Sequence, residues 1–157
     1  MTDIALLWSN DALGADFALQ QGQLATDDGL RTAIIISLFS DGRARDDDDL
    51  STGDDRRGWW GDAFLPPNDR IGSRLWLLER EKLTQQTLLR LRDYTREALA
   101  WLIEDGIAAA VSVITERQGL DRADIHIEIT RPDRTISRFD FIWPGTAANL
   151  GGGINAL

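Results

Sequence analysis

The chain has 157 residues, of which 43% are hydrophobic and 27% charged, and its formal net charge is −9 at pH 7. A chain of this length can bury a core as one domain, and its negative charge argues against nucleic-acid binding. Because it has no cysteine, disulfides, thiolate nucleophiles and cysteine-bound zinc are excluded. We find neither the pattern of a secretory signal nor an apolar run near the ~20 residues of a membrane span, and we therefore expect a soluble, cytoplasmically made protein.

The first forty residues predict short strands followed by a helix. Residues 4–8 and 15–20 read as strands, and the chain between Gly22 and Thr26 is expected to form a hairpin arm. The apolar stretch 30–39 could be a well-covered helix or a buried strand, and its length favours the helix. Side chains suited to cap that helix precede it at Thr26, Asp27 and Asp28.

The composition changes sharply over residues 41–58, where four consecutive aspartates are flanked by glycines and arginines. Such a stretch cannot bury itself, and we expect an exposed acidic loop. A second break follows at residues 66–69, with the sequence Pro-Pro-Asn-Asp. Residues 70–82 then read as a short helix.

A longer helix is predicted from about Gln85 to Asp105, capped by Thr84. Its apolar positions recur at helical spacing and define one buried stripe, comprising Leu88, Leu91, Thr95, Ala98, Leu99 and Leu102. Gly106 stands where a left-handed residue commonly ends a helix.

After Gly106 the apolar period becomes two, which is typical of half-buried strands. Residues 109–115, 125–130 and 138–143 form three such runs, linked by turns near Gly119 and Pro132. The sequence thus predicts a single α+β domain over residues 1–144, an antiparallel meander packed on one long and one or two shorter helices. Residues 145–157 are expected to be a flexible tail.

No residue type stands out as a catalytic centre. The single histidine, His126, lies on the polar face of its predicted strand beside Glu128, and we interpret it as a solvated or cross-strand group rather than a general base. Among 26 acidic residues, none is singled out as a paired carboxylate of the kind glycosidases use. A tail-associated peptidoglycan hydrolase remains an alternative hypothesis.

The aspartate run Asp46–Asp49 raises a second alternative, a cation-dependent binding module. A calcium loop of the EF-hand type needs alternating acidic ligands, a central glycine and a final glutamate. Counted from Asp47, the central position is Thr52 and the final one is Gly58. The pattern fails, so a solvated or docking loop is favoured and no metal site is predicted.

Tryptophan and arginine placement indicates protein interfaces, because these residues carry much of the binding energy where proteins meet. Trp59 and Trp60 lie between Gly58 and Gly61, next to Arg57. Trp101 is interpreted as a core residue. The candidate partner-binding residues are Arg57, Trp59, Trp60, Asp62, Arg70, Arg74, Trp76, Arg80 and Glu104.

Three strings in this sequence resemble one family: Arg-Gly-Trp-Trp-Gly-Asp at 57–62, Asp-Arg-Ile-Gly-Ser-Arg-Leu-Trp-Leu-Leu at 69–78, and Glu-Ala-Leu-Ala-Trp-Leu-Ile-Glu-Asp-Gly at 97–106. They resemble the Mu-like phage tail and baseplate family, over about residues 3–144. That family is similar to the "lysozyme-like" baseplate wedge subunit of T-even phages, a sheath initiator. Gly72 and Ser73 match its glycine-containing helix start. Glu104 matches the glutamate of its Glu-Pro-Arg motif, whereas Asp105 and Gly106 replace the proline and arginine.

The resemblance implies a structural role without enzyme activity. It implies six copies around the hub of a contractile tail, each contacting larger wedge subunits, the hub and the first ring of sheath, with no nucleic-acid or membrane partner. The isolated protein would be a monomer or a weak oligomer, and the assembled protein would reside in the virion tail.

Overall fold

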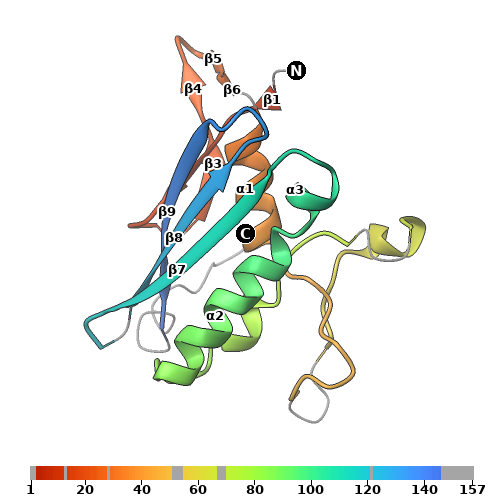
Figure 1. Ribbon diagram of the computed structural model, residues 1–157, viewed down its shortest axis with the longest axis vertical. Coiled ribbons are helices and arrows are strands. Elements are labelled where there is room, and N and C mark those ends of the chain that lie inside the picture. The colour runs from red at the N-terminus through yellow and green to blue at the C-terminus, as the bar shows by residue number, and fades with distance from the viewer. Residues whose placement is uncertain are drawn as a thin grey trace.

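The computed structural model describes residues 3–12, 14–27, 29–50, 55–66, 70–120 and 122–145. Within these ranges, short N-terminal strands lead into helix α1, two 3₁₀-helical turns, helices α2 and α3, and three long strands. Helices and antiparallel strands share one body, and the predicted α+β class is confirmed (Figure 1).

The three long strands form an antiparallel meander in the order β7 (Ala110–Gln118), β8 (Arg122–Thr130) and β9 (Ile136–Pro144). Because side chains alternate across a strand, Val113, Ile127 and Phe139 lie opposite one another in register and are all buried. The predicted meander is confirmed, and each strand extends beyond its predicted range.

Helix α2 (Gln85–Ala98) lies across one face of this sheet and covers β7 (Figure 1). The Thr84 hydroxyl accepts a hydrogen bond from the Thr87 amide at 3.2 Å, which confirms the predicted cap. The predicted stripe also faces the core, where Leu91, Leu99 and Leu102 are fully buried.

The predicted helix from Gln85 to Asp105 is wrong in one respect, because it is two helices. Helix α2 ends at Ala98, and a short helix α3 (Trp101–Glu104) follows. At the break, the amides of Leu99 and Ala100 donate to carbonyls only three residues back, a tightening common at helix ends. Gly106 ends α3 with φ of 70°, as predicted.

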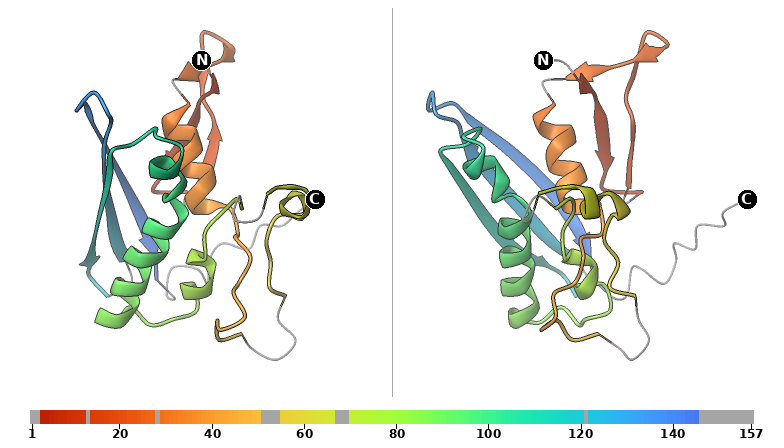
Figure 2. Two further views of the ribbon diagram at one scale, coloured as in Figure 1. Left: turned by 45° about the vertical axis from the view of Figure 1, so that its right-hand side comes forward. Right: turned by 90° about the vertical axis from the view of Figure 1, so that its right-hand side faces the viewer.

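Helix α1 (Leu30–Phe39) lies between the C-terminal sheet and the N-terminal strands, as the right-hand view of Figure 2 shows. Phe39 makes ring contacts on both sides, stacking on Trp8 at 3.6 Å and meeting Phe141 edge-on at 5.4 Å. A helix covered from both sides can be apolar over much of its surface; of the three consecutive isoleucines, Ile34 and Ile35 are buried, whereas Ile36 is 42% exposed.

The described residues do not confirm the predicted cap of α1. The helix begins after Gly29, which has φ of 77° and makes no side-chain capping bond. Thr26 instead belongs to a strand paired with Ile4. The Asp27 side chain and Asp28 lie outside the described residues.

Three short antiparallel ladders make up the N-terminal strands. β1 (Asp3–Ile4) pairs with β6 (Thr26–Asp27), β2 (Leu6–Ser9) with β3 (Gly14–Phe17), and β4 (Leu19–Gln20) with β5 (Gln23–Leu24). The predicted strands 4–8 and 15–20 are therefore each interrupted, and the predicted hairpin turns at Gln21 and Gly22, whose φ angles of 52° and 78° suit a tight turn.

The three ladders meet at a junction of three alanines, Ala5, Ala18 and Ala25. The Ala5 amide donates to the Ala25 carbonyl at 2.8 Å, the Ala25 amide to the Ala18 carbonyl at 2.8 Å, and the Ala18 amide to the Ala5 carbonyl at 3.0 Å. Each alanine thus donates to one partner and accepts from the other. This closed ring of hydrogen bonds fixes the directions in which the three ladders leave the junction.

The predicted helix over residues 70–82 is also wrong, since only the 3₁₀-helical turn η2 (Leu75–Leu78) forms there. Gly72 has φ of 98°, a left-handed conformation that stops a right-handed helix. Its Cα lies so close to the segment 40–42 that an added Cβ would approach the Ser40 carbonyl oxygen to 2.6 Å.

Parts of three predictions fall outside the described residues: 51–54 of the acidic loop, 67–69 of the second break and 146–157 of the tail. Gly145, the last described residue, is buried at the end of β9. The domain boundaries at residues 144 and 145 stay a prediction.

Candidate functional site

Many described residues of the acidic segment are exposed, as the sequence predicts, but parts of it are fastened to the body. We call its described residues, 41–50 and 55–58, the strap. The Gly42 amide donates to the Ser73 carbonyl at 2.7 Å, and the Ala44 amide donates to Arg56 at 2.9 Å, so the strap is bonded both to the body and to itself. Ala44 is buried. The backbone of the strap is therefore held against η2 and α2.

A buried ion pair fastens the strap to α2. The Arg74 guanidinium contacts the Asp48 carboxylate at 2.6 Å, and the two side chains are only 10% and 7% exposed. Arg74 also pairs with Glu97 at 2.6 Å, lies 4.3 Å from the Tyr94 ring centroid and shares Glu97 with Arg45. Burial opposes the charge of Arg74, but its bonds to Glu97 and Asp48 outweigh burial and raise its pKa.

A second fastening lies on the other side of the strap. The Trp76 indole N–H donates to the Gly42 carbonyl at 2.7 Å, and the Arg57 guanidinium lies 4.4 Å from the Trp76 ring centroid while pairing with Asp41 at 2.8 Å. Trp76 is thus half-buried under the strap.

Most of the predicted partner-binding residues gather around two hollows on either side of the strap. One, of about 380 Å³, is lined by Arg70, Arg74 and Glu104 together with Arg43 and Trp101. The other, of about 360 Å³, is lined by Arg57, Trp76 and Arg80. The structure therefore brings together residues as far apart in the chain as Arg43 and Glu104, and it forms two arginine-bearing surfaces.

The remaining predicted residues, Trp59, Trp60 and Asp62, lie at the turn η1 (Trp60–Phe64), where the two tryptophans and Phe64 form an exposed aromatic cluster. Trp59, Trp60 and Phe64 are 43%, 75% and 82% exposed, and their ring centroids follow one another at 5.4 and 6.1 Å. We call these three residues the aromatic knob. Figure 1 shows η1 as the yellow coil at the right, set away from the sheet.

Two neighbours hold the knob in shape. The Trp59 ring lies over Gly61, where an added Cβ would come within 2.1 Å of it. Asp62 accepts a hydrogen bond from the Ile71 amide at 3.2 Å and ties η1 to the chain before η2. Its other oxygen is buried and has no hydrogen-bond partner among the residues that the structure describes. Asp62 thus fixes the position of the aromatic knob relative to the chain before η2.

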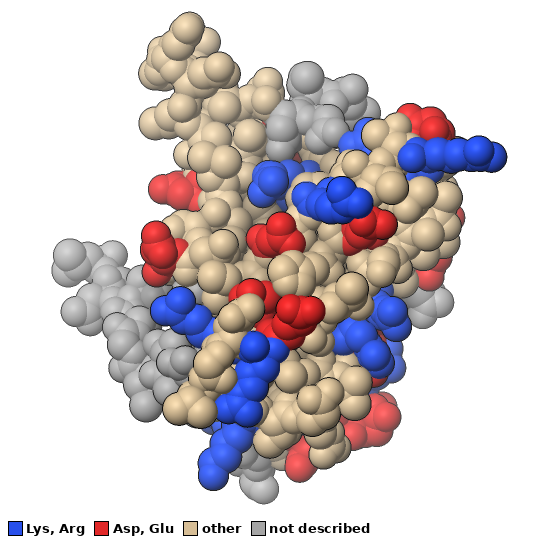
Figure 3. Space-filling view, turned by 60° about the vertical axis from the view of Figure 1, so that its left-hand side comes forward, with Lys and Arg blue, Asp and Glu red and all other residues tan. Residues whose placement is uncertain are grey.

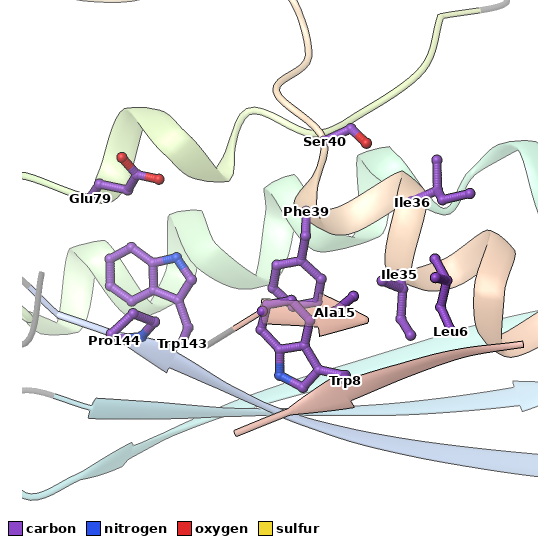
Figure 4. Close-up of a pocket in the computed structure, with 11 residues that line it drawn as sticks. Leu6, Trp8, Ala15, Ile35, Ile36, Phe39, Ser40, Glu79, Trp143 and Pro144 are labelled. Carbon is purple, nitrogen blue, oxygen red and sulfur yellow. The ribbon is translucent and has the colours of Figure 1, made fainter. Parts of the chain in front are cut away.

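Sequence reasoning missed two surfaces as well as Phe64. One is a groove of about 400 Å³ beside α1, which we call the apolar groove and which Figure 4 shows; Leu6, Trp8, Ile35, Ile36, Phe39 and Trp143 line it. The other is the apolar surface of the hairpin over residues 17–26, which we call the arm; the sequence predicted a hairpin arm between Gly22 and Thr26, but not that it presents such a surface. The sequence feature that could have indicated this surface is the absence of charge from all ten residues 17–26, in a chain in which 27% of the residues are charged.

The structure also locates the residues weighed for chemistry. His126 contacts Asp140 on β9 at 2.6 Å, which agrees with its interpretation as a cross-strand group. Within the described ranges, no cluster of histidine and acidic side chains could hold a metal ion. Searched over the same ranges, no helix is long and apolar enough to cross a membrane.

Fold and surface together define a small α+β domain that displays aromatic and arginine side chains around a fastened strap. Residues 30–136 match the family model described as phage protein GP46. The chain is 46% identical over 143 residues to baseplate protein gp46 of Escherichia phage Mu, covering 90% of this chain and 95% of that protein. It is 36% identical over 143 residues to Mu-like prophage FluMu protein gp46 of Haemophilus influenzae, covering 90% and 96%.

The chain belongs to this Mu-like phage baseplate protein family, as its tryptophan and glycine strings predicted. The expected location in the tail baseplate of the virion is confirmed with it. Both named relatives are phage or prophage proteins, which supports a structural role in the baseplate.

Proposed function

We propose that this chain is a wedge subunit of a contractile-tail baseplate that binds larger wedge and hub proteins and initiates the sheath, without enzyme activity. The observation that carries the proposal is the aromatic knob. Trp60 and Phe64 expose most of their rings to solvent, although aromatic side chains gain more than most from burial. A fixed, protruding group of this kind is typical of a surface that a partner covers.

The two hollows support the same proposal by their chemistry. Arginine binds carboxylates through a planar fork and stacks on aromatic rings, which suits it to protein interfaces. Here Arg57 and Arg74 are held by the strap, while Arg70 and Arg80 remain exposed at the rims. Partners can thus contact Arg70 and Arg80 directly, and Arg57 through the part of its side chain that remains exposed.

The sheath-initiating part of the proposal rests on the edge of the sheet. Strand β7 is nine residues long and pairs only with β8 among the described strands, whereas on β9 the Ile142 amide donates a hydrogen bond to the Asn10 side-chain oxygen at 3.1 Å. An open edge of this length is a template for an added strand. We propose that a sheath segment pairs with β7.

The test of the knob is the paired substitution Trp60→Ala with Phe64→Ala in a phage that depends on this gene. Because both rings are exposed, folding should be retained, and circular dichroism and the thermal midpoint should match those of the unchanged protein. Tails should fail to assemble, and the variant should no longer co-purify with the other baseplate proteins. The matched control is Leu120→Ala, a side chain that is 84% exposed on the β7–β8 turn.

Normal numbers of infectious particles from a folded double variant would show that the knob is not a partner site. The edge is tested separately by Val111→Pro, which removes an amide from β7, with assembly arrested before sheath polymerisation as the expected result. Turnover of purified peptidoglycan by the protein would overturn the non-enzymatic role.

A further inference from the structure

The arm is an uncharged projection from the N-terminal strands. Residues 17–26 include no acidic or basic side chain, and Figure 3 shows the arm as a projection without coloured groups at the upper left. Phe17, Leu19 and Leu24 are 60%, 71% and 50% exposed. Exposed apolar side chains so close together in a charged protein mark a contact surface.

The register places Leu19 and Leu24 on one side of the arm. They are directly opposite in the β4–β5 ladder, and directly opposite residues share a face. Phe17 belongs to β3, where it pairs with Leu6 at the base of the arm, before the interruption at Ala18. The alanine junction holds the base of the arm, so this apolar face points in a fixed direction.

The apolar groove has the complementary character. Trp8 and Phe39 stack within it, and Glu79 is the one charged side chain among the described residues that line it (Figure 4). Its volume of about 400 Å³ lies in the range of about 300–1,000 Å³ that pockets use to hold compact apolar groups. The tip of a hairpin carrying two leucines is a group of this size.

The two surfaces of one molecule cannot meet without unfolding the arm. Figure 1 shows the arm beyond the N-terminal end of α1, whereas the groove lies beside Ile35, Ile36 and Phe39, in the second half of that helix. If the arm and the groove contact each other, they must therefore belong to two different copies of this chain.

We infer that the arm of one copy docks into the apolar groove of the neighbouring copy in the baseplate, with Leu19 and Leu24 filling the groove. This inference rests on the proposed function, in which several copies surround the tail axis. A projection on one side and a hollow on another make a head-to-tail contact, and such contacts close into a ring when the rotation permits.

The charge of the two surfaces fits this occupant. The arm brings no charged group into the groove, so the only ionic group affected is Glu79, whose pKa burial already raises. The contact involves a hairpin tip and is far smaller than the roughly 1,600 Å² that stable complexes bury. Copies should therefore dock when the baseplate holds them side by side and separate when purified at low concentration.

The natural absence of cysteine permits a direct test. Leu24→Cys combined with Ile36→Cys is introduced into phage particles, which are then treated with a short bis-maleimide and separated on a denaturing gel. We expect a ladder of multimers of this chain, because each copy would be linked to the next. Either single variant should give no species above a dimer. The matched control, Leu120→Cys with Ile36→Cys, should give no ladder.

A missing ladder, or links from position 36 only to a different protein, would overturn the inference. Phe17→Cys combined with Ile36→Cys should also give links between copies. Adding Leu19→Asp and Leu24→Asp to this pair should abolish those links, while the protein still co-purifies with other baseplate proteins. Failure of the knob substitutions to affect assembly, with the ladder intact, would instead count against the proposed function alone.

Discussion

Arg74 and Asp48 are 26 positions apart in the chain, yet their side chains meet at 2.6 Å in a nearly buried ion pair. Arg74 belongs to the start of η2 and Asp48 to the strap. The pair therefore determines where the acidic segment lies, and through Glu97 it joins the strap to α2.

Arg74→Ala should lower the free energy of unfolding by about 3–5 kcal/mol, because it leaves Asp48 buried without its partner. Urea denaturation measures the change. Arg45→Ala, which removes an ion pair to the same Glu97 from a side chain that is 55% exposed, should cost less than about 1 kcal/mol. Equal losses for the two variants would contradict a special role for the buried pair.

Gly72→Ala should destabilise the protein far more than Gly106→Ala. Both glycines have positive φ, at 98° and 70°, so both substitutions force an alanine into the left-handed conformation at a cost of about 1–2 kcal/mol. At Gly72 a Cβ would also press within 2.6 Å of the Ser40 oxygen and 2.7 Å of the Gly42 nitrogen, while Gly106 faces open space. Thermal midpoints of the two variants provide the comparison, and similar midpoints would show that the strap yields easily.

Trp76→Phe should loosen the strap while leaving the core intact. The substitution removes the indole donor to Gly42, worth about 1 kcal/mol. Hydrogen exchange should quicken at the Gly42 and Ala44 amides. Trp101→Phe removes a comparable bond, to the Ser37 hydroxyl at 3.1 Å, and should leave exchange in the strap unchanged. Exchange that is unaltered in both variants would rule out Trp76 as a fastening.

The stability contributed by His126 should depend on pH. Its hydrogen bond to Asp140, opposed by slight burial and aided by the charges of Asp124 and Glu116, raises the pKa of His126 above 6.5. Because folding favours the charged ring, the contribution is complete below a pH of about 6.5 and is lost as the pH rises through the folded pKa.

His126→Gln should therefore lower the thermal midpoint at a pH of about 5.5 and have little effect at a pH of about 8.5. Asp140→Asn should show the same dependence, and titration of the ring by NMR should show its pKa falling in that variant. A midpoint difference that is constant with pH would contradict this assignment.

The periodic parts of the chain could be predicted from sequence because burial alone dictates them. The meander and the stripe of α2 follow from apolar residues recurring at periods of two and of about 3.6, and Leu88, Leu91, Val113 and Ile127 are buried as that reasoning requires. The paired tryptophans likewise identified the knob, since few core patterns place two tryptophans between glycines.

The errors occur where contacts between distant segments override local preference. Residues 70–82 have helical character, but Gly72 is pressed against the strap and only Leu75–Leu78 forms a turn. The strap itself reads as a solvated charge run, yet Asp48 is buried by Arg74. Neither the arm nor the apolar groove has a local pattern strong enough to predict where its members meet.

The junction of Ala5, Ala18 and Ala25 has a consequence for how the N-terminal region tolerates change. Each of the three peptide groups is both a donor and an acceptor within one closed circuit, so none can shift without releasing the other two. Ala5 and Ala18 are both buried, and each carries only a methyl group. The direction of the arm consequently depends on three small side chains, and replacing any one of the alanines by a larger residue would redirect all three ladders together.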